Sequence, residues 1–106
     1  MSFTVKTEIL NYGAKLTLTG ALDSSSAPEL NEEIKKIILL NPKELVMDVE
    51  QLDFMASAGL RVIIFAKQKL GPAVNLILVK PQEQMVETLR MTGLIFSVVI
   101  VDKYPE

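Results

Sequence analysis

The chain has 106 residues, 49% of them hydrophobic and only 6% aromatic, which predicts one small folded domain with an aliphatic core rather than a disordered chain. Its formal net charge of −2 implies no basic face and makes nucleic acid a poor candidate partner. The absence of cysteine and histidine excludes disulfides, thiolate chemistry, a Ser-His-Asp hydrolase and the commonest metal ligand.

Two alternating runs at the start of the chain predict an antiparallel hairpin. Apolar and polar residues alternate loosely over residues 2–10 and cleanly over residues 14–20, as in strands with one buried face. Asn11-Tyr12-Gly13 between them is a turn signal. We expect residues 20–23 to close the hairpin.

An amphipathic helix is predicted next. Residues 26–29 (Ser-Ala-Pro-Glu) have the spacing of a capping box, with proline suited to the first turn. Asn41-Pro42 ends the helix. Its buried stripe is expected to contain the apolar residues at helical spacing, which are Ala27, Leu30, Ile34, Ile37 and Ile38.

The rest of the chain alternates strands with helices. Strands are predicted over residues 43–49, 74–79 and 97–101, and the first of them is apolar enough for a sheet interior covered on both faces. Helices are predicted from residue 57 to about 70 and over 82–91, each ended by a glycine. The order ββαβαβαβ predicts a single α/β domain over residues 1–106 with a mixed sheet and helices packed on it.

Small residues join the strand at 43–49 to the helix that follows it. Ala56, Ser57, Ala58 and Gly59 suit a tight turn of the kind that carries sites in α/β domains. We expect Ser57 to cap the helix, because its hydroxyl can accept from an amide of the first turn. Ser57 is also the only hydroxyl between Asp53 and Thr88, so it is the candidate oxygen nucleophile of the loop.

Residues 54–62 (Phe-Met-Ala-Ser-Ala-Gly-Leu-Arg-Val) resemble the phosphorylation loop of STAS domains, specifically of bacterial anti-sigma factor antagonists. The phosphorylated serine of that motif falls on Ser57. Ala56 stands where many members have aspartate, and Ala58 where they have a second serine. Residues 20–30 resemble the Gly-Glu-Leu-Asp segment of the same family and the proline-containing helix start after it, with Asp23 matching the aspartate.

The resemblance implies a binding switch rather than an enzyme. The unphosphorylated protein is expected to bind an anti-sigma factor that is also a serine kinase, and so to release a sigma factor. Phosphorylation of Ser57 ends binding, and a serine phosphatase restores it. The expected partner-binding residues are Asp23, Met55, Ala56, Ala58, Gly59 and Arg61, with no catalytic residue, cofactor or metal.

Other interpretations of the same residues stay open. A STAS module of a lipid-transport or stress-signalling complex is the alternative binding function, and a small nucleotide-binding enzyme is disfavoured by the missing histidine, cysteine and phosphate loop. Asp23, Asp48 and Asp53 could be imagined as a Mg²⁺ site, but their spacing carries no specific signal. Asp23 also suits a turn, and Asp48 a satisfied structural carboxylate near a strand end.

The methionines and the ends of the chain complete the expectations. Met47, Met85 and Met91 are predicted to fill the core, whereas Met55 is predicted to face a partner. The N-terminus lacks the pattern of a signal peptide, and no apolar run approaches the roughly 20 residues of a membrane span. We therefore expect a cytoplasmic protein without membrane contact.

Overall fold

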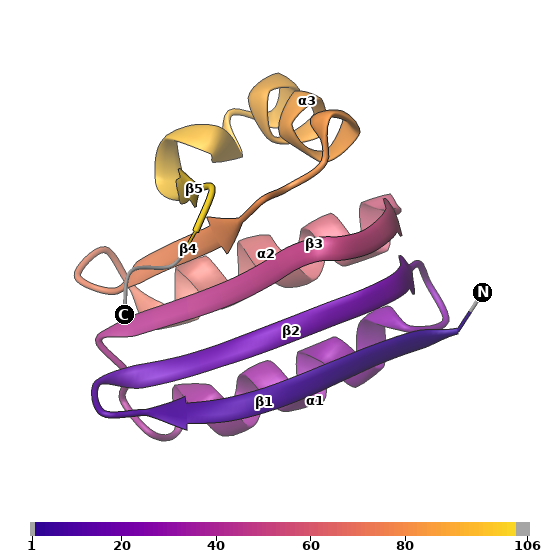
Figure 1. The fold of residues 1–106 in the computed structure, drawn as a ribbon. Helices are drawn as coiled ribbons and strands as arrows, with labels where there is room; N and C mark the ends of the chain where they lie inside the picture. The colour runs from indigo at the N-terminus through magenta and orange to yellow at the C-terminus, as the bar shows by residue number, and fades with distance from the viewer. Residues whose placement is uncertain (1, 104–106) are drawn as a thin grey trace.

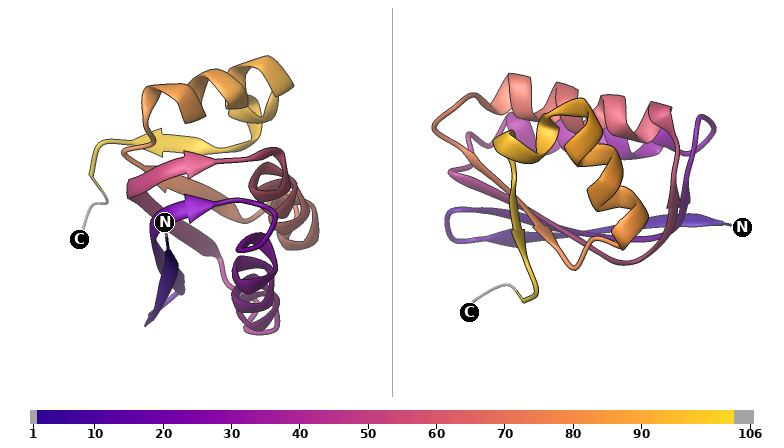
Figure 2. Two further views of the ribbon diagram at one scale, coloured as in Figure 1. Left: turned by 90° about the vertical axis from the view of Figure 1, so that its right-hand side faces the viewer. Right: turned by 90° about the horizontal axis from the view of Figure 1, so that it is seen from above.

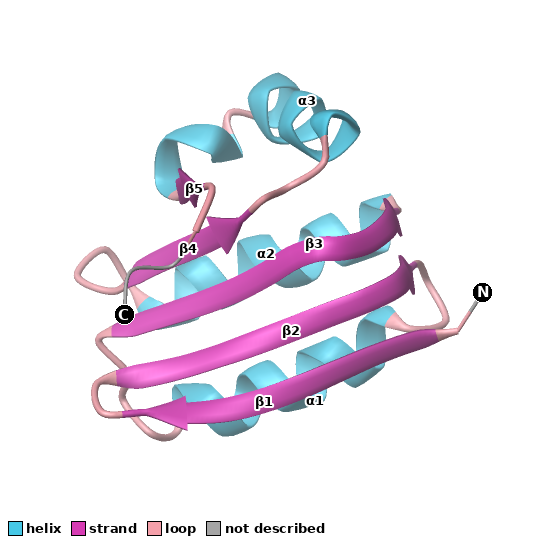
Figure 3. Cartoon of the chain, viewed as in Figure 1, coloured by secondary structure: helices cyan, strands magenta, loops and turns pink. Residues whose placement is uncertain are grey.

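Strands and helices alternate around a five-stranded sheet in the computed structural model, which describes residues 2–103 (Figures 1 and 3). The predicted order ββαβαβαβ is confirmed, with one short 3₁₀ helix added before the last strand. In chain order the elements are β1 (Phe3–Leu10), β2 (Gly13–Leu22), α1 (Ala27–Ile38), β3 (Glu44–Met55), α2 (Ser57–Leu70), β4 (Asn75–Val79), α3 (Glu83–Thr92), η1 (Leu94–Ser97) and β5 (Val99–Val101).

The strands lie in the sheet in the order in which they occur in the chain. The hairpin pairs β1 with β2 in antiparallel fashion, and each later strand pairs in parallel with the one before it. Because β2 and β3 are parallel, the loops that follow them leave the sheet at the same edge. That edge carries Asp23, which follows β2, and Ser57, which follows β3.

Helices α1 and α2 both pack on one face of the sheet, as the left view of Figure 2 shows. The predicted stripe of α1 is confirmed, with Ile38 only partly buried. Met85 and Leu89 of α3 belong to the same core. The largest fully buried side chains are almost all branched aliphatics, in keeping with the low aromatic content, and are Leu16, Leu18, Leu22, Leu30, Ile34, Ile37, Leu45, Met47, Ile63, Leu76, Leu78 and Leu89.

The opposite face of the sheet holds a second, smaller apolar cluster. Val46, Ile77 and Val79 form it, and Val101 packs against them. Helices α1 and α2 lie on the other face. The expectation that the strand at 43–49 is covered on both faces is confirmed, because Leu45 and Met47 are buried on one face and Val46 on the other. The alternation of β3 explains its apolar sequence, because Val46 enters this cluster while Leu45 and Met47 enter the main core.

Strands β2 and β3 are longer than predicted because two irregularities let their pairing continue. The register shifts between Thr17 and Thr19 and again between Gly20 and Ala21, and each shift inserts one extra residue into β3. At the first shift the Asp48 carboxylate accepts a hydrogen bond from the Glu50 amide at 3.1 Å. Asp48 is therefore a satisfied carboxylate, as expected, but in mid-strand rather than near a strand end.

The C-terminal part departs from the prediction in two places. The last strand starts at Val99 rather than residue 97, because residues 94–97 form η1. Met91, predicted to lie in the core, is 85% exposed on α3. Gly93 ends α3 in a left-handed conformation, φ 79°, as its position predicted. Within residues 2–103, no helix has the length and apolar character to span a bilayer.

Candidate functional site

Ser57 lies at the first position of α2, where β3 has just ended. Ala56 precedes it in an extended conformation and is the true N-cap, and its carbonyl accepts from the amides of Gly59 at 3.0 Å and Leu60 at 3.2 Å. The predicted capping role of Ser57 is therefore wrong, because Ser57 is one residue too far along the helix. Its side chain is exposed and its hydroxyl makes no hydrogen bond with any described residue. The Ser57 hydroxyl oxygen is therefore accessible to a modifying enzyme.

Packing beneath the loop accounts for its small residues. Gly59 is buried, and a Cβ atom there would lie only 2.6 Å from Cγ and 2.7 Å from Cδ2 of Leu22. It would also approach Cγ of Met55 to 3.1 Å. Ala58 is partly buried and packs against the core. Both residues thus hold the start of α2 close to β2, and the buried Gly59 supports the loop rather than offering a side chain to a partner.

The Asp23 loop lies beside the Ser57 loop, as the parallel strands predicted. Leu22 is in register with Met55, and the Ala56 amide donates to the Leu22 carbonyl at 2.8 Å. Asp23 directly follows Leu22, and Ser57 follows Ala56. The two loops therefore leave one edge of the sheet from adjacent strands.

Asp23 organises the turn that leads into α1. Its Oδ1 atom accepts from the Ser25 hydroxyl at 2.8 Å and from the Ser25 and Ser26 amides at 3.0 and 3.1 Å. Hydrogen bonds to the charged form, the Ser25 hydroxyl first among them, lower the pKa of Asp23 below its ordinary value of 3.8. The Asp23 carboxylate therefore has a structural role in this turn, in addition to any contact with a partner.

Ser26 acts in the same turn and not as half of a capping box. Its hydroxyl donates to the Ala21 carbonyl at 2.8 Å and accepts from the Asp23 amide at 2.9 Å. No side chain makes a hydrogen bond that caps α1. The predicted capping box is wrong because the Ser26 hydroxyl points back into the turn, where unpaired backbone groups of β2 compete for it.

We expect Asp23→Ala to lower the melting temperature at pH 7, because it removes the acceptor for four hydrogen bonds from Ser25 and Ser26. A depressed pKa means that this stabilisation is complete above about pH 4 and is lost as pH falls through the lowered value. The gap in melting temperature between wild type and variant should therefore close in acid, which calorimetry from pH 7 to pH 2.5 would measure. Asp53→Ala, which removes an exposed carboxylate that has no hydrogen-bond partner among residues 2–103, is the matched control. A gap that persists at the lowest pH would contradict this assignment.

Phe54 is the surface residue that sequence reasoning missed. Simple alternation from buried Leu52 would turn Asp53 outward and Phe54 inward. The second register shift adds Asp53 as an extra residue, so Phe54 also faces outward and is 44% exposed. Met55, predicted to face a partner, is instead partly buried and packs against the core. Long-range strand pairing decides this orientation, and no local signal announces it.

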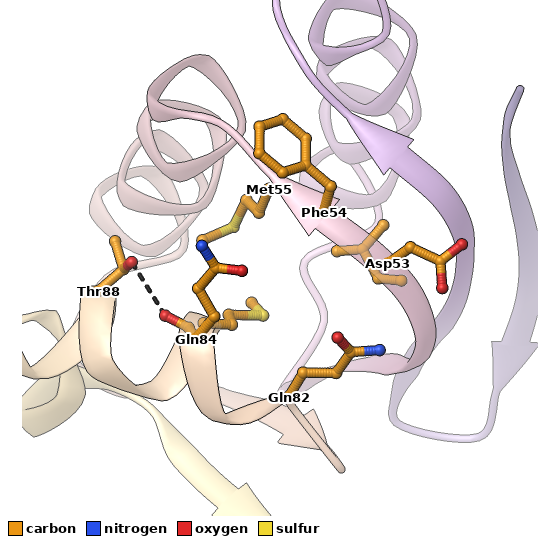
Figure 4. Close-up of a pocket in the computed structure, with 8 residues that line it drawn as sticks. Asp53, Phe54, Met55, Gln82, Gln84 and Thr88 are labelled. Atoms are coloured by element: carbon orange, nitrogen blue, oxygen red, sulfur yellow. Dashed lines mark hydrogen bonds between the residues drawn. The ribbon is translucent and has the colours of Figure 1, made fainter. Parts of the chain in front are cut away.

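A small hollow lies beside the loop, between the end of β3 and the start of α3 (Figure 4). Its volume of about 40 Å³ is enough for a few water molecules and far too small for a nucleotide. The Thr88 hydroxyl on its far wall donates to the Gln84 carbonyl at 3.1 Å. This geometry favours a contact surface over a catalytic pocket. The lining residues are Leu52, Asp53, Phe54, Met55, Gln82, Gln84, Met85 and Thr88. Nothing in the sequence indicates that the last four lie beside the Ser57 loop.

The charge of the site is uneven. Arg61 is the only basic residue between positions 44 and 66, and it is exposed on α2 one turn after Ser57. Asp23 and Asp53 are the acidic residues of the two neighbouring segments. The imagined Mg²⁺ site is not formed, since no three acidic side chains in the described part of the chain gather closely enough to hold a metal ion.

Comparison with known proteins places these features in context. A family model described as the STAS domain matches residues 4–106. The chain is similar to the anti-sigma-F factor antagonist RsfB of Mycobacterium tuberculosis, with 32% identity over 74 residues, which are 70% of this chain. The match spans about three fifths of that relative's length, 61%.

Solved structures with a similar fold include an anti-sigma factor antagonist from Mycobacterium paratuberculosis. It has a TM-score of 0.86 and 24% identity, and the match covers 96% of this chain and 87% of that one. Another is the Bacillus cell fate determinant SpoIIAA in its phosphorylated form, with a TM-score of 0.76 and 20% identity over 94% of this chain and 93% of that one. At these identities the likeness establishes the fold.

Proposed function

This chain belongs to the STAS domain family, and we propose that it is an anti-sigma factor antagonist whose binding is switched by phosphorylation of Ser57. The observation that carries the proposal is the exposed Ser57 hydroxyl, free of hydrogen bonds to residues 2–103, at the edge shared with the Asp23 loop. The name of the relative RsfB and the phosphorylated form of SpoIIAA support it.

In its unphosphorylated form the protein binds an anti-sigma factor in the cytoplasm, and a sigma factor is thereby released. The contact surface consists of Ser57, Phe54, Arg61 and the Asp23 loop, which all border one edge of the sheet. A neutral hydroxyl and an exposed aromatic ring favour close approach of a partner, whereas the hollow beside them is too small for a substrate. The chain works through binding and catalyses nothing in this scheme.

The anti-sigma factor is also the kinase, and ATP is its phosphate donor. Ser57 Oγ forms a bond to the γ-phosphorus while the bond from that phosphorus to the oxygen of the departing ADP breaks. The hydroxyl proton passes to a base of the kinase, because the Ser57 hydroxyl makes no hydrogen bond to any side chain among residues 2–103 that could take it. A serine phosphatase later hydrolyses the phosphate ester and restores the hydroxyl.

The phosphate acts at the interface and leaves the fold intact. It brings about −1.5 to −2 charges at neutral pH, and it lies at the first turn of α2, where helix amides and the helix dipole favour anions. Ala56 offers no negative charge to repel it. Added bulk and charge therefore oppose the partner, which is shaped for a neutral side chain, and do not disturb the core.

The decisive experiment is phosphorylation by the anti-sigma factor that the protein binds. We expect a single phosphate on Ser57, because Ala58 replaces the second serine of the motif. Mass spectrometry of the product would locate it, with Ser57→Ala as the control that stays unmodified. Phosphate on Ser24, Ser25 or Ser26 would overturn the assignment.

Phe54 offers the sharpest test of the surface. We expect Phe54→Lys to weaken partner binding by about tenfold, roughly 1.4 kcal/mol, with little change in melting temperature, because its ring is 44% exposed. Phe96→Lys changes an even more exposed phenylalanine on η1 and is the matched control, for which unchanged affinity is expected. Titration calorimetry gives both affinities. Equal losses in the two variants would show that the effect is not local to the Ser57 loop.

Met55→Lys belongs in the same series as a contrast. Met55 packs against the core beside Gly59, so a lysine there should lower the melting temperature as well as the affinity. It therefore cannot separate binding from stability, whereas Phe54→Lys can.

A further inference from the structure

Arg61 is an exposed cation on α2 that has no ion-pair or hydrogen-bond partner among residues 2–103. The four ion pairs among residues 2–103 join Lys35, Lys36, Lys80 and Arg90 to glutamates, and none involves Arg61. Its guanidinium makes no hydrogen bond with a described residue either. Arg61, the only basic residue between positions 44 and 66, can therefore bind an anion from outside the described fold.

Ser57 and Arg61 are four residues apart in one helix, and both are exposed. Side chains at positions i and i+4 are neighbours on a helix surface, about 5–6 Å apart at Cβ. The pair is stronger when the anion comes first in the sequence, which is the order here. A phosphate on Ser57 would therefore be within reach of the arginine, whose planar fork binds phosphate oxygens in pairs.

We propose that Arg61 forms an ion pair with phosphorylated Ser57, and that the unphosphorylated protein uses the same guanidinium to bind an acidic group of its partner. The inference rests on the proposed phosphorylation of Ser57. It makes the switch a competition, because the phosphate both repels the partner's acidic group and occupies the one cation that attracts it. Arg61 is thus a binding residue in one state and a phosphate-holding residue in the other.

Phosphorus NMR tests the pair without kinase or partner, on protein with phosphoserine incorporated at position 57 during synthesis. A nearby cation favours the dianion, so Arg61 lowers the second pKa of the phosphate, which is ordinarily about 6. We expect Arg61→Gln to raise that pKa by about 0.2–0.4 pH units, the size of an i,i+4 pair, and 1 M NaCl to remove the difference. Asp23 and Asp53 affect the phosphate equally in both proteins and cancel in the comparison.

Two control variants make the result specific. Lys69→Gln removes the same charge from the same helix, at a distance of about 18 Å along its axis, and should leave the pKa unchanged. Arg61→Lys keeps the charge and should retain most of the shift. An unchanged pKa in Arg61→Gln, or an equal change in Lys69→Gln, would overturn the ion pair.

Affinity measurements with the partner test the competition. Arg61→Gln should weaken binding of the unphosphorylated protein, and phosphorylation should then reduce affinity by a smaller factor than in wild type. Equal factors in the two proteins would overturn the role of Arg61 in switching. Failure here differs from failure of the proposed function, since an unmodified Ser57 after treatment with the kinase would refute the latter whatever the titration gives.

Discussion

Phosphorylation of Ser57 is expected to lower the affinity for the anti-sigma factor by tenfold or more, roughly 1.4 kcal/mol, while the domain melts at nearly the same temperature. The side chain is exposed, and its hydroxyl bonds to none of the described residues, so modification removes no internal interaction. The new charge lies at a helix N-terminus, which favours anions. The free energy of unfolding therefore changes little, and the loss of affinity arises at the interface.

Two variants and two measurements separate these effects. Ser57→Asp should weaken binding in the same direction as the phosphate, whereas Ser57→Ala should bind and resist phosphorylation. Because Ala56 is the N-cap, Ser57→Ala should change the free energy of unfolding by no more than about 0.5 kcal/mol, less than the loss of a capping serine. Scanning calorimetry and titration calorimetry on all four forms would decide. A phosphorylated form that melts much earlier, or that binds as well as the plain form, would contradict the mechanism.

Replacement of Gly59 by alanine should destabilise the domain by about 1–2 kcal/mol. Its Cβ would lie 2.6 Å from Cγ of Leu22, which is fully buried and has little room to move, and such overpacking typically costs about 1–3 kcal/mol. Helix propensity alone predicts the opposite sign, a gain of about 0.5–1 kcal/mol for alanine over glycine. The sign of the change in urea denaturation therefore distinguishes packing from propensity.

A double-mutant cycle assigns the effect to one contact. Leu22→Ala empties the space that the new methyl group would enter, so the combined variant should lose less free energy than the sum of the two single losses. Ser57→Ala, in the same helical turn but on the surface, is the control with little effect. Strict additivity of the two changes would show that Gly59 is not held against Leu22.

The order of elements and much of the candidate site follow from local pattern. Alternation in residues 14–20 and the helical spacing of Leu30, Ile34 and Ile37 depend only on which face of an element must be buried, and both agree with the structure. Ser57 is the candidate because residues 54–62 resemble the phosphorylation loop of the family and because it has the only hydroxyl between Asp53 and Thr88. The side-by-side position of the Asp23 and Ser57 loops also followed, since parallel strands end at the same edge.

Strand pairing and packing over long distances settled the rest. The extra residue at Asp53 turns Phe54 outward and Met55 toward the core, and it arises from the register between β2 and β3, which lie some thirty residues apart in the chain. The N-cap of α2 is Ala56 rather than the predicted Ser57, because the hydrogen bond from the Ala56 amide to the Leu22 carbonyl fixes where β3 ends. Ser26 is a local case, because its hydroxyl bonds to backbone groups only three and five residues before it, at Asp23 and Ala21. Residues at the ends of strands and helices have several possible hydrogen-bond partners of comparable energy. At the end of β3 the pairing with β2 determines which partner is used, and local spacing in the sequence does not encode that pairing.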